Sequence, residues 1–143
     1  MDHTRVLVVD DHAIVRMGIC RILSSAPDFD VVCETANGED AVQKAQEHLP
    51  DVVLLDISLP GINGIDAARR IRAVSPVSHV IFMSEHDSSN MVKEAFLAGG
   101  NGYILKSEAG QELLNAMRIV QAGKQYISGS IRLSQALSTF NIN

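Results

Sequence analysis

Acidic, hydroxyl and basic side chains follow successive apolar runs of this chain, where they could do chemistry together. Asp10 and Asp11 follow the first run, Asp56 the third, Ser84 the fourth and Lys106 the fifth. Three carboxylates brought close together repel one another and need a cation, and an all-oxygen cluster with room for water suits Mg²⁺ better than zinc or a caged calcium. Lys106 would add a second, fixed positive charge on the far side of this carboxylate cluster.

These groups fit phosphoryl transfer to a carboxylate. A metal ion and a lysine around one exposed carboxylate neutralise the transferred oxygens while the attacking oxygen is held in line. Ser84 can donate a hydrogen bond to the same phosphoryl group. Asp56 is the best nucleophile candidate, because it is the only acid in a segment that is otherwise apolar back to Val52. Each residue alone could be a helix cap or a solvated charge, so the prediction depends on the whole set.

The apolar runs themselves predict five buried strands. They are continuous rather than alternating, as expected of strands that are covered on both faces of a parallel sheet. Their ranges are 6–9, 31–33, 52–55, 80–83 and 103–105. Apolar faces with helical spacing follow them within 15–22, 41–49, 65–71, 91–96 and 113–120. The last two end at Gly99-Gly100 and at Gly123, which suit the left-handed turn after a helix.

This alternation of strands and helices predicts the fold class. Parallel neighbours need a crossover, and the crossover is nearly always a right-handed helix. We expect an α/β protein with a flavodoxin-like, doubly wound, five-stranded parallel sheet of order 2-1-3-4-5 and helices on both faces. In that order the first and third strands are neighbours, so Asp10, Asp11 and Asp56 converge at the switch point.

Length and composition limit the classes of function. The chain of 143 residues has the size of one domain, and its formal net charge of −5 is the wrong sign for a protein that neutralises the phosphates of a duplex. Its first residues run directly into a four-residue apolar stretch, which is far too short for a membrane span, and nothing there resembles a signal peptide. We therefore expect a cytoplasmic protein that has no membrane partner and is not itself a good DNA binder.

Three motifs resemble the receiver domain of bacterial two-component response regulators. They are VVDDH at 8–12, LLDISLPG at 54–61 together with Gly64, and GYILK at 102–106. The resemblance covers about Arg5 to Gly123, and these motifs in this order are highly specific. The Asp-Asp-His triplet and the AGKQY segment at 122–126 are similar to the NarL/FixJ branch, whose members usually carry a LuxR-type helix-turn-helix domain after the receiver.

The resemblance implies a phosphoacceptor and a metal site. Asp56 would be the phosphoacceptor. Asp11 and Asp56 would ligate Mg²⁺ together with the backbone carbonyl of Ser58, and Asp10 would act partly through water. The donor would be a phosphohistidine on a sensor histidine kinase. The protein would catalyse its own phosphorylation and dephosphorylation without turning over an external substrate, so we do not expect an enzyme in the usual sense.

The same resemblance implies a switch. Ser84 and Lys106 would hold the phosphoryl group, and Tyr103 would be the aromatic residue that turns inward when Ser84 moves. Such a movement would repack the surface around the fourth helix and the fifth strand, which predicts a change in self-association, with a homodimer forming on phosphorylation.

Two residues near the expected site depart from the pattern of the family. Ser107 stands where many receivers have a proline in a cis bond, and the sequence leaves the geometry of the Lys106–Ser107 bond open. Glu85 stands where the family usually has a small residue. By resemblance Ser58 and His86 flank the approach of water to the phosphorus. We therefore expect Ser58, Glu85 and His86 to modulate the rates.

The chain is expected to divide near its C-terminus. Residues 1–123 would form the receiver domain, and residues 124–143 a tail or linker toward an effector domain that this chain does not contain. The tail predicts one short helix or none, from a weak apolar pattern at Ile131, Leu133, Leu137 and Phe140. It is too short for a three-helix DNA-binding module, so DNA contact would need a C-terminal helix-turn-helix domain beyond it.

The favoured function is a phosphorylation-dependent signalling switch that regulates transcription through such a domain. A stand-alone receiver that acts by protein contact is the alternative. A haloacid-dehalogenase-type phosphatase also uses an aspartate nucleophile and Mg²⁺, but that family places a second acid where this chain has Ser58. A flavodoxin-like FMN carrier is disfavoured, because Asp10 and Asp11 would repel the phosphate of the cofactor.

Overall fold

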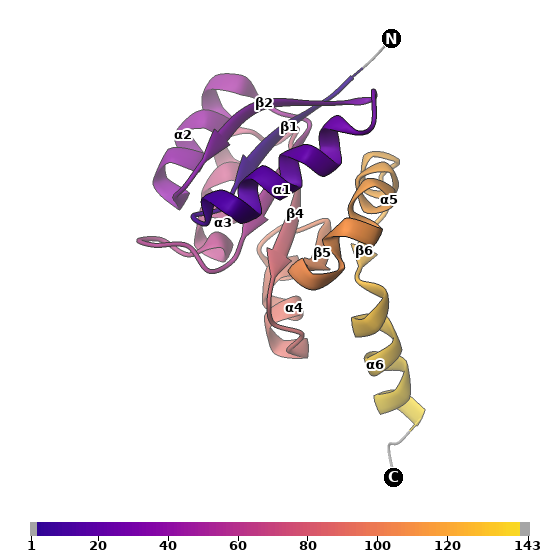
Figure 1. Ribbon diagram of the computed structural model, residues 1–143. Helices are drawn as coiled ribbons and strands as arrows, with labels where there is room; N and C mark the ends of the chain where they lie inside the picture. The colour runs from indigo at the N-terminus through magenta and orange to yellow at the C-terminus, as the bar shows by residue number, and fades with distance from the viewer. Residues whose placement is uncertain (1–2, 141–143) are drawn as a thin grey trace.

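Within residues 3–140, which the computed structural model describes, six parallel strands form one sheet with helices on both faces (Figure 1). The strands are β1 (Thr4–Val9), β2 (Phe29–Thr35), β3 (Val52–Asp56), β4 (His79–Ser84), β5 (Gly102–Leu105) and β6 (Tyr126–Ile127). The helices are α1 (Ala13–Ser24), α2 (Gly38–His48), α3 (Gly64–Val74), α4 (Ser89–Leu97), the 3₁₀ turn η1 (Lys106–Glu108), α5 (Ala109–Gln121) and α6 (Gly129–Phe140). In this described part of the chain, no helix combines the length and hydropathy that crossing a membrane needs.

The strand order is β2-β1-β3-β4-β5-β6. Its first five strands follow the predicted order, so the flavodoxin-like fold class is confirmed and β1 lies beside β3. The structure adds β6 to the predicted five strands, with Gly102 opposite Tyr126 and Tyr103 opposite Ile127. A two-residue strand carries no periodicity, so the sequence pattern could not distinguish it from a loop.

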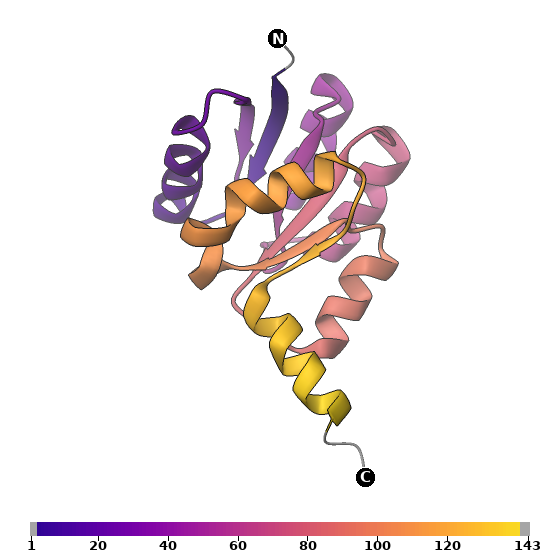
Figure 2. The ribbon, with the colours of Figure 1, turned by 90° about the vertical axis from the view of Figure 1, so that its right-hand side faces the viewer.

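Different helices cover the two faces of the sheet (Figure 2). Leu7 and Val9 of β1 belong to the apolar cluster that includes residues of α2, α3 and α4, whereas Val6 and Val8 belong to the cluster of α1 and α5. The alternation follows from the two-residue period of a strand. Because both faces are covered, all four residues are buried, which explains the continuous apolar runs.

Local signals set the ends of the helices. The side chains of Asn37, Asn63 and Ser88 precede α2, α3 and α4, and each accepts a hydrogen bond from a backbone N–H three residues further on. Gly99 and Gly123 follow α4 and α5 with φ angles of 101° and 89°. The left-handed turns predicted at these glycines are therefore confirmed.

The tail folds onto the free edge of β5 and then leaves the body of the molecule as α6 (Figure 1). The sequence predicted one short helix or none, and the helix runs over Gly129–Phe140. The side chains at 136–140, including those of Leu137 and Phe140, and residues 1–2 and 141–143 lie outside the described part of the chain. The division at residue 123 stays a prediction, and β6 lies on its tail side.

Candidate functional site

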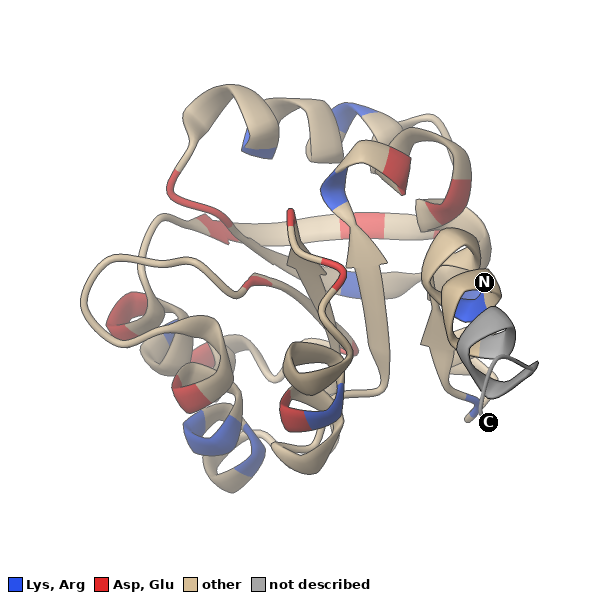
Figure 3. Ribbon diagram, turned by 90° about the horizontal axis from the view of Figure 1, so that it is seen from below, with Lys and Arg blue, Asp and Glu red and all other residues tan. Residues whose placement is uncertain are grey.

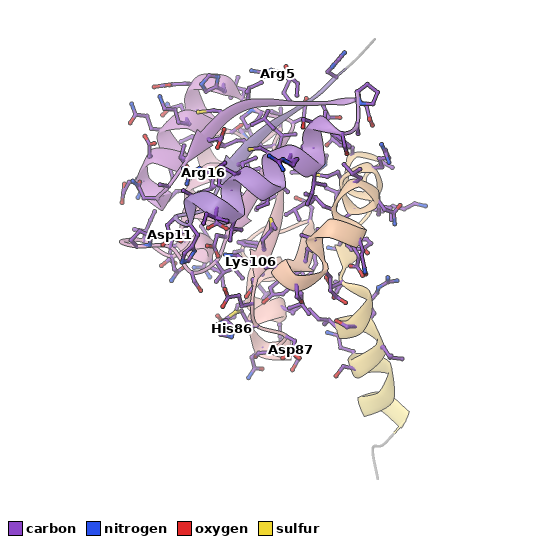
Figure 4. All side chains as sticks on the ribbon, viewed as in Figure 1. Arg5, Asp11, Arg16, His86, Asp87 and Lys106 are labelled. Carbon is purple, nitrogen blue, oxygen red and sulfur yellow. The ribbon has the colours of Figure 1, made fainter. Side chains whose placement is uncertain are left out.

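The carboxyl ends of β1, β3 and β5 bring together the charged side chains predicted to converge there. Ligand atoms of Asp10, Asp11, His12 and Asp56 all lie within 4.8 Å of one another. The Lys106 ammonium lies 2.9 Å from Asp56 Oδ2 and 3.0 Å from Asp10 Oδ2. Seen from this end of the sheet, acidic positions surround the strand ends (Figure 3), and Asp11 and Lys106 face the same region (Figure 4).

Asp56 is held in one orientation at the end of β3. Its residue is only 1% exposed, its Oδ1 accepts a hydrogen bond from the Ser58 backbone N–H at 3.1 Å, and its Oδ2 accepts one from Lys106. Burial raises the pKa of the Asp56 carboxyl, and the Asp10 charge adds to this against the opposing effect of Lys106. The negative charge of Asp56 is therefore only partly compensated.

Asp10 is fully buried beside it. Its Oδ1 accepts a hydrogen bond from the His12 backbone N–H at 2.9 Å, whereas its Oδ2 has the Lys106 ammonium nearby but no aligned hydrogen bond. Asp10, Asp11 and Asp56 together with one lysine leave a net charge of about −2 when all are ionised. The three carboxylates and their excess negative charge fit a hard divalent cation such as Mg²⁺.

Lys106 stays charged in this pocket. Burial acts to lower the pKa of its ammonium, but the hydrogen bond to Asp56 and the negative charges of Asp56 and Asp10 outweigh burial and raise the pKa. The residue opens the 3₁₀ turn η1 directly after β5. None of the described peptide bonds is cis, so the Lys106–Ser107 bond, whose geometry the sequence left open, is trans.

Ser84 and Tyr103 are linked through the loop after β4. The Ser84 hydroxyl accepts a hydrogen bond from the His86 backbone N–H at 3.0 Å and lies 3.8 Å from the sulfur of Met91. The Tyr103 hydroxyl donates to the His86 carbonyl at 2.7 Å. Tyr103 is fully buried in this structure, so its side chain already points inward. Its role as a switch stays a prediction.

The three residues expected to modulate rates are exposed at this end of the sheet. Ser58 lies on the loop that leaves Asp56, and Glu85 and His86 lie on the loop that leaves Ser84. Figure 4 shows His86 and Asp87 beyond Lys106, on the side away from the body of the sheet. Their exposure agrees with a position at the entrance, and their effect on rates stays a prediction.

Sequence reasoning missed a residue that fixes the backbone of the acidic pair. Arg16, on the second turn of α1, donates from Nη1 to the Asp10 carbonyl at 2.6 Å and from Nε to Glu34 at 3.2 Å. It thereby ties the junction between β1 and α1 to β2 (Figure 4). A basic residue one helical turn after Asp-Asp-His was the available signal. Thr35, at the end of β2, is also buried and its hydroxyl has no partner.

Gly64 allows α3 to begin close to the end of β3. Its N–H donates to the Ile57 carbonyl at 2.8 Å, and a Cβ at this position would lie 2.2 Å from the Asp56 carbonyl oxygen. Any larger residue would displace the segment that carries Asp56.

A doubly wound parallel sheet that gathers three carboxylates and a lysine at its switch point defines a class of protein, the receiver-type signalling domain. Residues 6–118 match the response regulator receiver domain family. The chain belongs to this family, in its LuxR-type branch. Members of the family are signalling proteins rather than conventional enzymes, and receiver domains generally bind Mg²⁺ at an acidic pocket like the one here.

Curated relatives are longer than this chain. The response regulator UvrY of Escherichia coli (strain K12) is 41% identical over 133 residues, which are 93% of this chain and 61% of UvrY. The response regulator GacA of Pseudomonas viridiflava is 39% identical over 136 residues, which are 95% of this chain and 64% of GacA. The chain thus spans less than two thirds of these relatives.

Solved structures show the same fold. A two-component response regulator of the LuxR family from Aurantimonas sp. SI85-9A1 has a TM-score of 0.91 and 34% identity, covering 98% of this chain and 100% of the other. The signal receiver domain of the putative response regulator NarL from Mycobacterium tuberculosis has a TM-score of 0.83 and 34% identity, covering 87% of this chain and 100% of the other.

Proposed function

We propose that this protein is a switch in which Asp56 accepts a phosphoryl group from a phosphohistidine of a sensor histidine kinase. The observation that carries the proposal is the 2.9 Å contact between the Lys106 ammonium and Asp56, within a buried cluster of carboxylates. In the transfer, an Asp56 oxygen bonds to phosphorus as the phosphorus–nitrogen bond of the donor breaks, and the electron pair returns to the donor imidazole. Lys106 then lies beside the oxygens that carry the transferred charge.

The remaining pocket residues would hold a metal ion and the phosphoryl group. Asp10, Asp11 and Asp56 would hold Mg²⁺ together with the Ser58 carbonyl, with Asp10 acting partly through water. The bound ion would supply positive charge to the phosphoryl oxygens. The excess of three carboxylates over one ammonium in the pocket supports this assignment. Ser84 would turn its hydroxyl proton away from the Met91 sulfur and donate it to the phosphoryl group.

Residues at the entrance would set how long the phosphoryl group stays. Ser58, Glu85 and His86 are exposed around the pocket, which supports an influence on the approach of water and of small anionic donors. Glu85 adds a negative charge that repels such donors, and this repulsion weakens as salt screens it.

The output of the switch would be transcription. Relatives of this chain are named as response regulators and transcriptional regulators, and they continue beyond the part that this chain matches. The net charge of −5 makes this chain itself a poor partner for DNA, so a C-terminal DNA-binding domain would make that contact, with two copies pairing on phosphorylation. A receiver that acts by protein contact alone is the second candidate.

Mass measurement after incubation with a small phosphodonor tests the proposal. With acetyl phosphate and Mg²⁺, the wild-type chain should gain one phosphate, and omitting Mg²⁺ should suppress the gain. Asp56→Asn should gain none. Asp66→Asn, which changes an exposed acid on α3, is the matched control and should gain the phosphate. Full modification of Asp56→Asn would refute the assignment.

A further inference from the structure

The ring of His12 lies against the carboxylates of the pocket and has no part in the proposed transfer to Asp56. Its Nδ1 lies 3.2 Å from Asp11 Oδ1 and 3.4 Å from Asp10 Oδ1. His12 precedes α1 as its N-cap, but its side chain makes no capping hydrogen bond there. The start of the helix therefore does not explain why the ring faces the acidic pair.

The imidazole adds a nitrogen donor to a set of oxygen donors. Ligand atoms of His12, Asp10, Asp11 and Asp56 all lie within 4.8 Å of one another. Three carboxylates and one imidazole form a donor set that Zn²⁺ and similar transition metal ions accept. Mg²⁺ takes oxygen ligands and gains little from an imidazole. The ring therefore extends the donor set toward a second class of metal ion.

The spacing around the ring agrees with a tetrahedral site. Bonds of about 2.1 Å to a tetrahedral ion place the ligand atoms about 3.4 Å apart. The two distances from His12 Nδ1 match this spacing. Asp10 and Asp56 are buried, whereas Asp11 and His12 are exposed. The exposed pair is therefore free to close on the buried pair where the spacing within the set is wider.

We propose that His12 is a metal ligand through which the pocket selects a transition metal ion such as Zn²⁺ over Mg²⁺, an inference that rests on the function proposed above. The transition metal ion is held by the His12 ring and the three carboxylates, which together supply four protein ligands. Mg²⁺ is held by oxygen ligands alone, without the ring.

The number of protein ligands determines what the bound ion can do. A four-coordinate site made entirely of protein ligands is closed, whereas a site that acts on a substrate keeps an open position. With the ring and the three carboxylates in place, no position remains for a phosphoryl oxygen. Zn²⁺ therefore opposes phosphorylation of Asp56, and loss of the His12 ring relieves this opposition.

Metal titrations of the full 143-residue chain test the assignment. His12→Asn keeps a polar side chain but removes the imidazole, so it should lower the affinity for Zn²⁺ by about tenfold or more. The affinity for Mg²⁺ should stay within about threefold of the wild-type value.

His86→Asn is the matched control for these titrations. His86 is also exposed at this end of the sheet, but it is not a member of the set whose ligand atoms lie within 4.8 Å of one another. Its substitution should leave both affinities unchanged. If the His12 ring only forms ion pairs with the carboxylates, His12→Asn would change the two metal affinities by the same factor. Such an equal change, or no change for either metal, would overturn the proposal.

Nitrogen NMR of the histidine-labelled chain gives a measurement that does not depend on affinity. The Nδ1 resonance of His12 should move strongly when Zn²⁺ binds and only slightly when Mg²⁺ binds, because only Zn²⁺ bonds to the ring. The His86 ring resonances should move little with either metal. An unmoved His12 Nδ1 resonance in the zinc-bound chain would overturn the proposal.

Phosphate uptake from acetyl phosphate separates this inference from the proposed function. With Mg²⁺ present, added Zn²⁺ should suppress uptake in the wild-type chain at a lower concentration than in His12→Asn. Equal suppression in the two chains would overturn the role of the ring and leave the phosphoacceptor role intact. Absence of uptake by the wild-type chain with Mg²⁺ alone would instead overturn the proposed function, and the inference with it.

Discussion

Two buried polar regions lie at opposite ends of the sheet, and they differ in how many of their polar atoms have hydrogen-bond partners. At the amino ends of β3 and β4, Ser75 and Ser78 are fully buried and their hydroxyls lie 2.7 Å apart. Ser78 donates to the Pro50 carbonyl, so its oxygen accepts the proton of Ser75. At the carboxyl ends, Asp10 and Asp56 share one ammonium, and an Asp10 oxygen lacks an aligned hydrogen bond.

The difference separates a polar group that supports the fold from one kept available for a ligand. Buried polar atoms normally find partners, because leaving one unsatisfied lowers stability. The serine pair follows this rule. The carboxylate cluster departs from it, and the departure fits a site whose missing partners are a cation and a phosphoryl group. Removing a carboxylate from the cluster should therefore stabilise the fold, whereas removing a hydroxyl of the serine pair should destabilise it.

The largest effect is expected for Lys106→Met. Removing the ammonium leaves Asp10 and Asp56 buried without their countercharge, so the free energy of unfolding should fall by about 3 kcal/mol at neutral pH. Urea unfolding measures it. Lys44→Met, which breaks a half-exposed pair with Glu47, is the control and should change the free energy by less than about 1 kcal/mol. Similar losses in the two variants would show that the cluster is not electrostatically strained.

Ser78→Ala should have the next largest effect on stability, without affecting the site. It leaves the Ser75 hydroxyl and the Pro50 carbonyl buried without their partner, so the free energy of unfolding should fall by about 2 kcal/mol. Phosphate uptake from acetyl phosphate should match that of the wild-type chain. Ser24→Ala, which removes an exposed hydroxyl, serves as the control for the loss of a serine. Impaired phosphorylation of Ser78→Ala would show that the serine pair and the carboxylate cluster are not independent.

Asp56→Asn should stabilise the chain in the absence of divalent cations, by about 1 kcal/mol at neutral pH. Burial raises the folded-state pKa of Asp56 above its ordinary value of 3.8, so the folded wild-type chain binds more protons and loses stability as pH rises between the two values. The asparagine variant lacks this loss. Its advantage should be present above the raised pKa and should shrink toward pH 3.8, as measured by urea unfolding across that range. An advantage independent of pH would contradict the raised pKa.

Thr35→Val is expected to have the smallest effect. The Thr35 hydroxyl is buried at the carboxyl end of β2 without a partner, and valine has nearly the same shape. Removing an unsatisfied hydroxyl should raise the free energy of unfolding by up to about 1 kcal/mol. Thermal unfolding measures the change. Destabilisation would mean that the hydroxyl has a partner, such as water, that contributes to the site.

The sequence was sufficient to predict which residues meet at the carboxyl ends of the strands, because the arrangement of these ends follows from the sheet topology alone. Once apolar runs alternate with amphipathic stretches, parallel strands place residues at their carboxyl ends on one edge of the sheet. The sequence alone therefore predicts that Asp10, Asp56 and Lys106 lie together. The glycines that end α4 and α5 were predicted separately, from where the helical spacing of apolar residues stops.

The remaining features depend on contacts that no periodic pattern records. Arg16 reaches the Asp10 carbonyl through a long side chain that is also held by an ion pair with Glu34. The attachment of Ser128 to β5 requires knowing that a two-residue strand fills the sheet edge. Ile131 and Leu133 look alike in sequence, and only the docked position of α6 makes one buried and the other exposed.

Localising the phosphoryl group tests the central claim most directly. The chain would be phosphorylated with acetyl phosphate and Mg²⁺, reduced with borohydride to convert a phosphoaspartate to homoserine, and mapped by peptide mass. We predict a single homoserine at position 56, in the wild-type chain and in the Asp66→Asn control alike. Homoserine at position 10 or 11 in place of position 56, or no homoserine in a chain that has gained a phosphate, would contradict the assignment of Asp56 as the phosphoacceptor.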